Sequence, residues 1–380
     1  MAIRYPYTDF HEMNLDWILS KVKDLEGVYD KLPSELYPFV TEWLEDNFIN
    51  DVYILPQYYG AVGDGVADDT EAMQQAIDAS ASESKILYIP KGTYKVTGLQ
   101  AKDGLQIHGA DLNGSVIYFQ SGSFTGNPTN HNLFNGGYIE NITITGNPAV
   151  SGQNGFSMVM ITSVIRKCIA RYFTGIGFDM QSPSTDYYQP MVDLGEAHGL
   201  EYCSASQCGT GFSLGTWDSL YSNIVASRCE SGVYISNGKV SGMHIWGFNK
   251  VGLSIGSNVE ISNLEVEAST VKNPEAVITF TGHDDIISGL RMWNLNVEEY
   301  LIWCHSAYNI TISGMVIGDA GHLTDADPTN VQGVGGALSN SIIRGIIDPS
   351  RTSGTAVSVT GTINKIEIYG NSNISGVTPV

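Results

Sequence analysis

Basic residues are scarce in this sequence. Its 380 residues include 19 Lys and Arg against 40 Asp and Glu, which gives a formal net charge of −21. Because nucleic acids are bound through clustered Lys and Arg, this balance predicts that nucleic acid is not a partner. The same shortage of positive charge argues against docking on an anionic membrane surface.

Paired cysteines and long apolar runs are also lacking. The five cysteines include no C-x-x-C spacing, and an odd number in a chain of this size predicts free, buried thiols. No run of about 18 apolar residues is present, so no membrane insertion is expected. No apolar core of a signal peptide follows Met1. We find no phosphate-loop or zinc motif, and we expect neither a cofactor nor a bound metal.

The first 50 residues differ from the rest because they have a heptad pattern of apolar residues. The apolar positions are Leu15, Ile18, Val22, Leu25, Tyr29 and Leu32. Steps of three and four residues are typical of a helix that winds around copies of itself. Residues 1–50 are therefore predicted to be a helical anchor and oligomerisation segment, with residues 14–32 at its centre. The alternative is an amphipathic helix that packs on its own domain.

Residues 51–100 contain a distinctive motif. The stretch 59–77 reads YGAVGDGVADDTEAMQQAI, and a short strand at 86–89 is followed by a Pro-Lys-Gly turn. Asp68 and Glu71 predict a capping box that opens a helix, with Ala72, Met73, Ala76 and Ile77 on its apolar face. The acidic residues Asp64, Asp68 and Asp69 are expected to serve turns and the helix cap rather than a catalytic or metal site.

This motif closely resembles the amino-terminal segment of pectate-lyase-like right-handed parallel β-helices, as found in phage tailspikes and related polysaccharide-degrading proteins. The resemblance implies that residues 51–100 form the start of the β-helix and its capping helix. It also implies a homotrimer, a host surface glycan as ligand, and attachment to tail or collar proteins of a virion through residues 1–50. The expected location is the virion, with action at the bacterial cell surface.

From residue 101 to 380 a short strand pattern recurs. It appears at 141–144, 223–226, 242–245, 263–266, 289–292, 312–315 and 364–367, and the copies from 223 to 315 begin about 20 to 26 residues apart. Strand repeats of this length without helices predict a β-solenoid, because one coil cannot bury its inner face alone. The fold class is therefore all-β, a single-stranded right-handed parallel β-helix with a short N-terminal α-helical segment and a capping helix. Cys208 and Cys229 are expected at equivalent positions of adjacent coils.

The repeat also predicts an outward face, because alternate side chains of a strand point in opposite directions. If Met243, Leu264 and Leu290 point inward, the residues that follow them point outward. Adjacent coils lie about 4.8 Å apart, which places Glu265 between His244 and Arg291, and Glu267 between Trp246 and Trp293.

Three interpretations of this face remain open. Trp246 and Trp293 are suited to stack on sugar rings, with His244 and Arg291 as further substrate-binding residues. Glu265 and Glu267 are about 6.5 Å apart along the strand, a separation compatible with paired acid and base catalysts of glycoside cleavage. The alternatives are a subunit interface and a surface charge ladder without function.

Two further segments have weaker signals. A longer loop at 181–198 supplies the alternative catalytic carboxylates Asp186, Asp193 and Glu196, because loops on rigid scaffolds often hold functional residues. The tetrapeptide 282–285, Gly-His-Asp-Asp, is similar to the paired aspartates of polygalacturonase-type β-helices, but the rest of that catalytic pattern is absent. Three hypotheses about function remain open. The protein is a virion appendage that binds polysaccharide, a polysaccharide hydrolase or lyase, or a non-catalytic structural or adhesive appendage.

Overall fold

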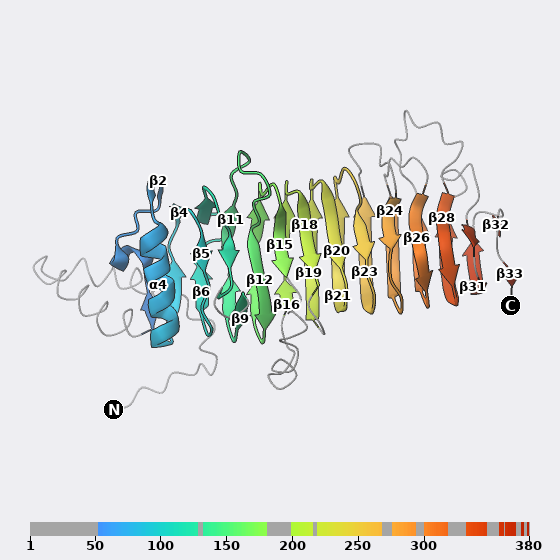
Figure 1. Ribbon diagram of the computed structural model, residues 1–380, viewed down its shortest axis with the longest axis horizontal. Coiled ribbons are helices and arrows are strands. Elements are labelled where there is room, and N and C mark those ends of the chain that lie inside the picture. The colour runs from blue at the N-terminus through green and yellow to red at the C-terminus, as the bar shows by residue number, and fades with distance from the viewer. Residues whose placement is uncertain are drawn as a thin grey trace, which may run out of the picture.

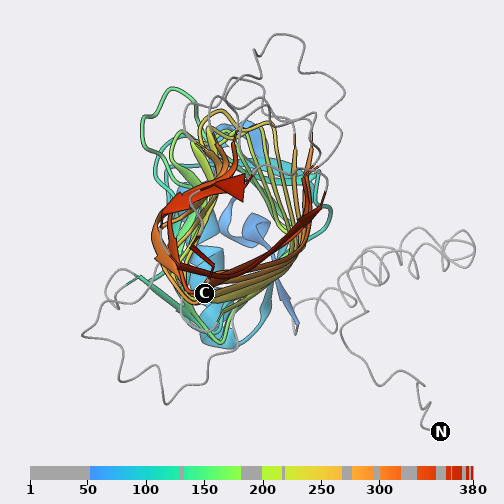
Figure 2. The ribbon, with the colours of Figure 1, turned by 90° about the vertical axis from the view of Figure 1, so that its right-hand side faces the viewer.

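The repeated strands stack in parallel along one long axis, so that each coil covers the apolar inner face of the next (Figure 1). The computed structural model describes residues 52–127, 132–180, 199–215, 219–267, 276–293, 300–317, 332–347, 357–360, 362–369, 374–375 and 378–379. The predicted helical segment 1–50 and the loop 181–198 lie outside these residues. Viewed along the long axis, the strands enclose a continuous core (Figure 2).

Two sheets wrap around this core. Sheet A consists of β1 (Tyr53–Ile54), β2 (Asp64–Asp68), β3 (Ile86–Ile89), β4 (Gly92–Val96), β6 (Gln106–Gly109), β7 (Ser115–Phe119), β10 (Tyr138–Glu140), β11 (Thr143–Thr145), β13 (Val164–Arg166), β14 (Ile169–Arg171), β16 (Gly199–Glu201), β17 (Ser204–Ser206), β19 (Ser219–Ser227), β21 (Gly238–Trp246), β23 (Val259–Glu267), β25 (Ile286–Trp293), β27 (Thr311–Ile317), β29 (Ser341–Ile347), β31 (Thr362–Tyr369) and β33 (Thr378–Pro379). Sheet B consists of β5 (Leu99–Gln100), β8 (Phe124–Thr125), β12 (Phe156–Ile161), β15 (Ile176–Met180), β18 (Thr210–Leu214), β20 (Ser231–Ile235), β22 (Leu253–Ile255), β24 (Ala276–Phe280), β26 (Tyr300–Tyr308), β28 (Gln332–Ser339), β30 (Val357–Thr360) and β32 (Ile374–Ser375), and β9 (Leu133–Asn135) pairs with β12.

Sheet A is folded lengthwise into two panels, which gives each coil three faces. The fold line runs through left-handed residues, and in successive coils these are Asn223, Gly242, Asn263, Gly289 and Gly314, with φ between 51° and 79°. Asparagine and glycine suit such corners because they adopt positive φ at low cost. We call the strand halves before this line the first panel and those after it the second panel.

The amino-terminal end of the stack is closed by a 3₁₀ helix, η4 (Pro56–Tyr59), and by α4 (Thr70–Glu83) (Figure 1). The predicted apolar face of α4 is confirmed, since Ala72, Met73, Ala76 and Ile77 are all buried. The predicted capping box is wrong. The N-cap residue is Asp69, which makes no side-chain cap bond, and Asp68 Oδ1 instead accepts the Thr70 N–H at 3.0 Å.

Cysteine and phenylalanine form columns inside the stack. All five cysteines are free and buried, and the register confirms that Cys208 lies directly over Cys229. The rings of Phe124, Phe156, Phe178 and Phe212 stack face to face, with centroid separations of 5.7, 5.2 and 4.9 Å. Beyond Phe212 the same column continues with aliphatic residues, Val233, Leu253, Ile278 and Ile302.

Because Phe178 is stacked on both sides and is fully buried, Phe178→Ala is expected to lower the free energy of unfolding by about 3–5 kcal/mol. Phe178→Leu is the matched control, since it keeps most of the buried volume and should cost clearly less. Guanidinium unfolding followed by circular dichroism measures both. Equal midpoints for the alanine variant and the wild type would contradict this account of the core.

Candidate functional site

The outward face predicted from the repeat is present on the second panel of sheet A. Its register pairs His244 with Glu265 and Glu265 with Arg291, and one position further along it pairs Trp246 with Glu267 and Glu267 with Trp293. The alternating residues Met243, Ile245, Leu264, Val266, Leu290 and Met292 are buried. The predicted juxtaposition of the six outward residues is therefore confirmed.

Glu267 makes a specific contact on this face. Its Oε1 lies 3.1 Å from Nε2 of His244, which is diagonally placed on the neighbouring strand. The two side chains are 26% and 34% exposed, so the pair is partly shielded but open to a ligand. Among the described residues Glu265 makes no ion pair within 4.0 Å, although Arg291 lies beside it in the register.

Arg228 also belongs to the site, although it was not among the residues predicted from the sequence. Its Cζ lies 5.0 Å from the ring centroid of Trp246, a cation–π arrangement. Arg228 has φ of 53° at the corner after β19, and the facing residue on the next coil is Gly247. A Cβ atom at position 247 would be 3.2 Å from Cγ of Arg228, so glycine leaves room for the arginine stem. The signal was in the repeat, because Arg228 directly follows Ser227, the register partner of Trp246.

The row that contains the two tryptophans continues onto earlier coils. In register it consists of Arg171, Ser206, Ser227, Trp246, Glu267 and Trp293, and we call it the tryptophan row. Arg171 donates from Nε to Oγ1 of Thr145 at 3.2 Å, and its Cζ lies 5.8 Å from the Tyr172 ring centroid.

The described arginines share one sheet of this acidic molecule. All arginines of the described residues lie on strands of sheet A or at its edge, namely Arg166, Arg171, Arg228, Arg291 and Arg344. Among them, Arg166 faces Glu201 at 3.9 Å. Within the described ranges, Arg171, Arg228 and Arg291 have no carboxylate within 4.0 Å, which leaves three guanidinium groups available to an anionic ligand.

The other acidic candidates have structural roles or cannot be placed. Asp64 accepts the N–H groups of Val66 and Ala67, and these bonds lower the pKa of its carboxyl group. Buried Asp69 accepts the N–H groups of Val62 and Gly63, as expected for turn chemistry. The alternative carboxylates Asp186, Asp193 and Glu196 lie outside the described residues.

The described part of the chain has neither a cluster of metal-ligating side chains nor a membrane-spanning helix. There, no three His, Cys, Asp or Glu side chains gather in a way that could hold a metal ion. Nor does any described helix have the length and apolar character needed to cross a membrane.

Comparison with known proteins identifies the class of fold. Residues 57–239 match the family model described as rhamnogalacturonase A/epimerase, pectate lyase-like. The solved A-module of the mannuronan C-5 epimerase AlgE6 from Azotobacter vinelandii is similar over 86% of this chain and 99% of that chain, with a TM-score of 0.59 and 19% identity. The gp42 tailspike of Acinetobacter phage vb_AbaP_AS12 is similar over 87% of this chain and 62% of that chain, with a TM-score of 0.51 and 7% identity. The solenoid is therefore a right-handed parallel β-helix, and residues 57–239 within it match a pectate lyase-like family model.

Curated relatives match shorter stretches. The preneck appendage protein of Bacillus phage PZA is 28% identical over 156 residues, which is 37% of this chain and 17% of that protein. The mannuronan C5-epimerase AlgE2 of Azotobacter vinelandii is 41% identical over 73 residues, which is 17% of this chain and 7% of that enzyme. The chain thus spans only a small part of the length of either relative. The chain is thus similar both to phage appendage proteins and to enzymes that act on polysaccharides.

Proposed function

We propose that this protein is a virion appendage that binds an acidic polysaccharide of a bacterial surface. The observation that carries the proposal is the tryptophan row, in which Trp246 and Trp293 flank Glu267 and Arg228 lies against Trp246. The similarity to a phage preneck appendage and to a tailspike supports the virion location.

The chemistry of the row suits a sugar chain. An indole face stacks on the apolar plane of a pyranose ring, while hydroxyl groups are bound by carboxylate and imidazole. The two tryptophans are two coils apart, about twice the strand spacing of about 4.8 Å, so a chain lying along the solenoid axis would contact both. Trp293 is 38% exposed, which leaves part of its indole surface for a ligand.

The preference for an acidic polymer follows from the arginines. Arg171, Arg228 and Arg291 have no carboxylate partner on the described surface, whereas the molecule as a whole has a net charge of −21. Guanidinium groups bind carboxylate and phosphate oxygens in paired hydrogen bonds, and an acidic glycan supplies such oxygens. These three guanidinium groups would reduce the repulsion between an acidic polymer and a protein of net negative charge.

Trp246→Ala and Trp293→Ala are each expected to weaken binding of the cognate polysaccharide by about 1–3 kcal/mol, the scale of losing one aromatic contact. Tyr234→Ala is the matched control, because Tyr234 is similarly exposed, at 40%, but lies on sheet B. Calorimetric titration with capsule and wall polysaccharides from candidate hosts measures the change. Affinity should also fall as salt rises, since arginines contribute to binding. Equal losses for all three variants would argue against a site on the second panel.

Cleavage is a second candidate function, favoured by the contact between His244 and Glu267. In that case Glu267→Gln should abolish product formation with little effect on affinity, because an amide can neither donate nor accept the catalytic proton. Sizing of the polymer after incubation with wild type, Glu265→Gln and Glu267→Gln separates the outcomes. Binding without shorter fragments would identify a non-catalytic appendage. Cleavage by both variants would direct the search to Asp186, Asp193 and Glu196.

We propose that residues 14–32 hold a homotrimer together and that residues 1–50 attach it to tail or collar proteins. The heptad pattern and the family resemblance support both statements. Removal of residues 1–50 is expected to convert the trimer to monomers, because the interhelical seam is lost. Light scattering of the shortened and full chains gives the two masses. A trimer that survives the deletion would place assembly on the β-helix itself.

A further inference from the structure

One column of residues begins the first panel of sheet A just after the turn from sheet B, and polar side chains within it are buried. At three of the described coils the polar residue is a buried serine: Ser163, Ser219 and Ser341. Ser163 Oγ accepts the Gly137 N–H at 3.0 Å and lies 2.8 Å from the carbonyl oxygen of Ile161. Ser341 Oγ accepts the Ile310 N–H at 3.0 Å and donates to the carbonyl oxygen of Ser339 at 2.7 Å. In Ser163 and Ser341 the hydroxyl group thus accepts a bond from the preceding coil and donates to a backbone carbonyl, which for Ser163 is that of Ile161 or, also at 2.8 Å, that of Phe134 on the preceding coil.

Asp285 occupies this column where other coils have serine. The strand register places it between Val259 and Ile310, and Ser341 follows on the next coil. Its Oδ1 accepts the Val259 N–H at 3.0 Å, the same bond that Ser163 and Ser341 accept. The residue is 0% exposed, and Oδ2 has no hydrogen-bond partner in the described structure.

Among the described residues, no Lys, Arg or His forms an ion pair with Asp285. On its own turn it is faced by Asp284 and His283, whose Nδ1 lies 2.8 Å from Oδ2 of Asp284 and whose ring stacks on Tyr308 at 4.6 Å. The turn of the preceding coil contributes Ser257, Asn258 and Val259, and that of the following coil contributes Tyr308, Asn309 and Ile310. On the turns of the preceding and following coils, only Tyr308 of these residues is titratable, whereas His283 and Asp284 titrate on the turn of Asp285 itself.

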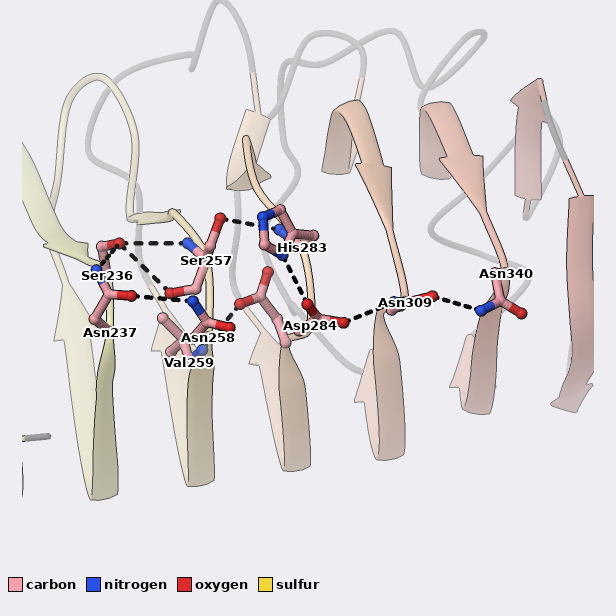
Figure 3. Close-up of polar contacts among 10 residues, drawn as sticks. Ser236, Asn237, Ser257, Asn258, Val259, His283, Asp284, Asn309 and Asn340 are labelled. Carbon is pink, nitrogen blue, oxygen red and sulfur yellow. Dashed lines mark hydrogen bonds and ion pairs between the residues drawn. The ribbon is translucent and has the colours of Figure 1, made fainter. Parts of the chain in front are cut away.

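The same turn interrupts a ladder of asparagine side chains (Figure 3). Asn258 Nδ2 donates to Asn237 Oδ1 at 3.1 Å, and Asn309 Nδ2 donates to Asp284 Oδ1 at 2.7 Å. The side chain of Asp284 has no N–H group, so it cannot donate a hydrogen bond to Asn258 as an asparagine side chain would. The side-chain ladder is therefore broken between Asn258 and this turn, where the coils are joined by other bonds: His283 N–H to Ser257 Oγ, Asn258 N–H to the His283 carbonyl, and Val259 N–H to Asp285 Oδ1.

We propose that Asp285 is held as a neutral carboxylic acid, in the role that serine has at other coils, and that its ionisation makes this turn a pH-sensitive joint in the solenoid. A protonated carboxyl keeps an acceptor oxygen for the Val259 N–H, as a serine hydroxyl does, and it carries no charge. A buried charge without a partner also costs far more than a buried neutral group.

The direction of the pH effect follows from linkage. Burial raises the pKa of Asp285 to about 7, while an unfolded aspartate titrates near its ordinary value of about 3.9. Between these values the folded state holds a proton that the unfolded state has released. The contribution of Asp285 to stability is thus greatest below about pH 4 and is lost as pH rises toward about 7.

The experiment compares the thermal unfolding midpoints of full-length wild type and Asp285→Ser from about pH 5 to about pH 8. The serine variant reproduces the chemistry of Ser163 and Ser341, so its midpoint relative to wild type is expected to rise by several degrees across this range. Ser341→Asp is the reciprocal variant and should acquire a loss of stability with rising pH. Asp285→Asn removes the titration but keeps the acceptor, so it should also flatten the dependence.

A difference between Asp285→Ser and wild type that stays constant with pH would overturn the proposal. If that variant does not fold, the infrared spectrum decides. Wild type minus Asp285→Asn should show the carbonyl band of a protonated carboxylic acid at about pH 6, below the raised pKa of about 7. Its absence, together with a pH-independent Ser341→Asp, would show that Asp285 is ionised and structural only.

Discussion

In-register stacking of parallel coils is the constraint on which the other features depend. A coil has no core of its own, so its inner side chains are buried only when the next coil repeats the same alternation at the same height. The stack then forces every outward position to lie beside its equivalent on neighbouring coils. Phenylalanines become a column, asparagines become a ladder, and two tryptophans two coils apart become the ends of one row.

The register was the part of the structure that the sequence revealed most clearly. Period-two alternation, together with repeats about 21 residues long, was enough to place Glu265 between His244 and Arg291, because both rules act on the backbone alone. What required the structure were contacts between side chains that are not direct register partners. His244 contacts Glu267 diagonally rather than Glu265, and Arg228 folds back on Trp246 from a corner.

The capping box and Asp285 show two other limits. Asp68 and Glu71 have the right spacing, but the chain enters α4 one residue later, because Asp69 is drawn inward to bind two backbone N–H groups. Asp285 looked like part of a weak catalytic motif, since sequence spacing does not reveal which of two adjacent aspartates turns into the core. Local patterns identify elements well, but they do not decide how a polar side chain is satisfied after the coils have closed.

The site and the buried carboxyl share the same two strands. β23 runs from Val259 to Glu267, and β25 begins one residue after Asp285 and ends at Trp293. The bond that joins these coils at Val259 thus lies at one end of the two strands, and the row of sugar-binding candidates lies at the other, beyond the corner at Asn263 and Gly289.

The phenylalanine column has a mechanical consequence. It runs through sheet B from Phe124 to Phe212 and then gives way to Val233 and other aliphatic residues, so cohesion between neighbouring coils is not uniform along the axis. In a one-dimensional array whose stability is summed over neighbours, unravelling proceeds through the weaker junctions and halts at the stronger ones. The aromatic segment is therefore expected to limit local unfolding. Unfolding that begins in the aliphatic coils would stop at Phe212 and leave the capped amino-terminal part of the solenoid folded.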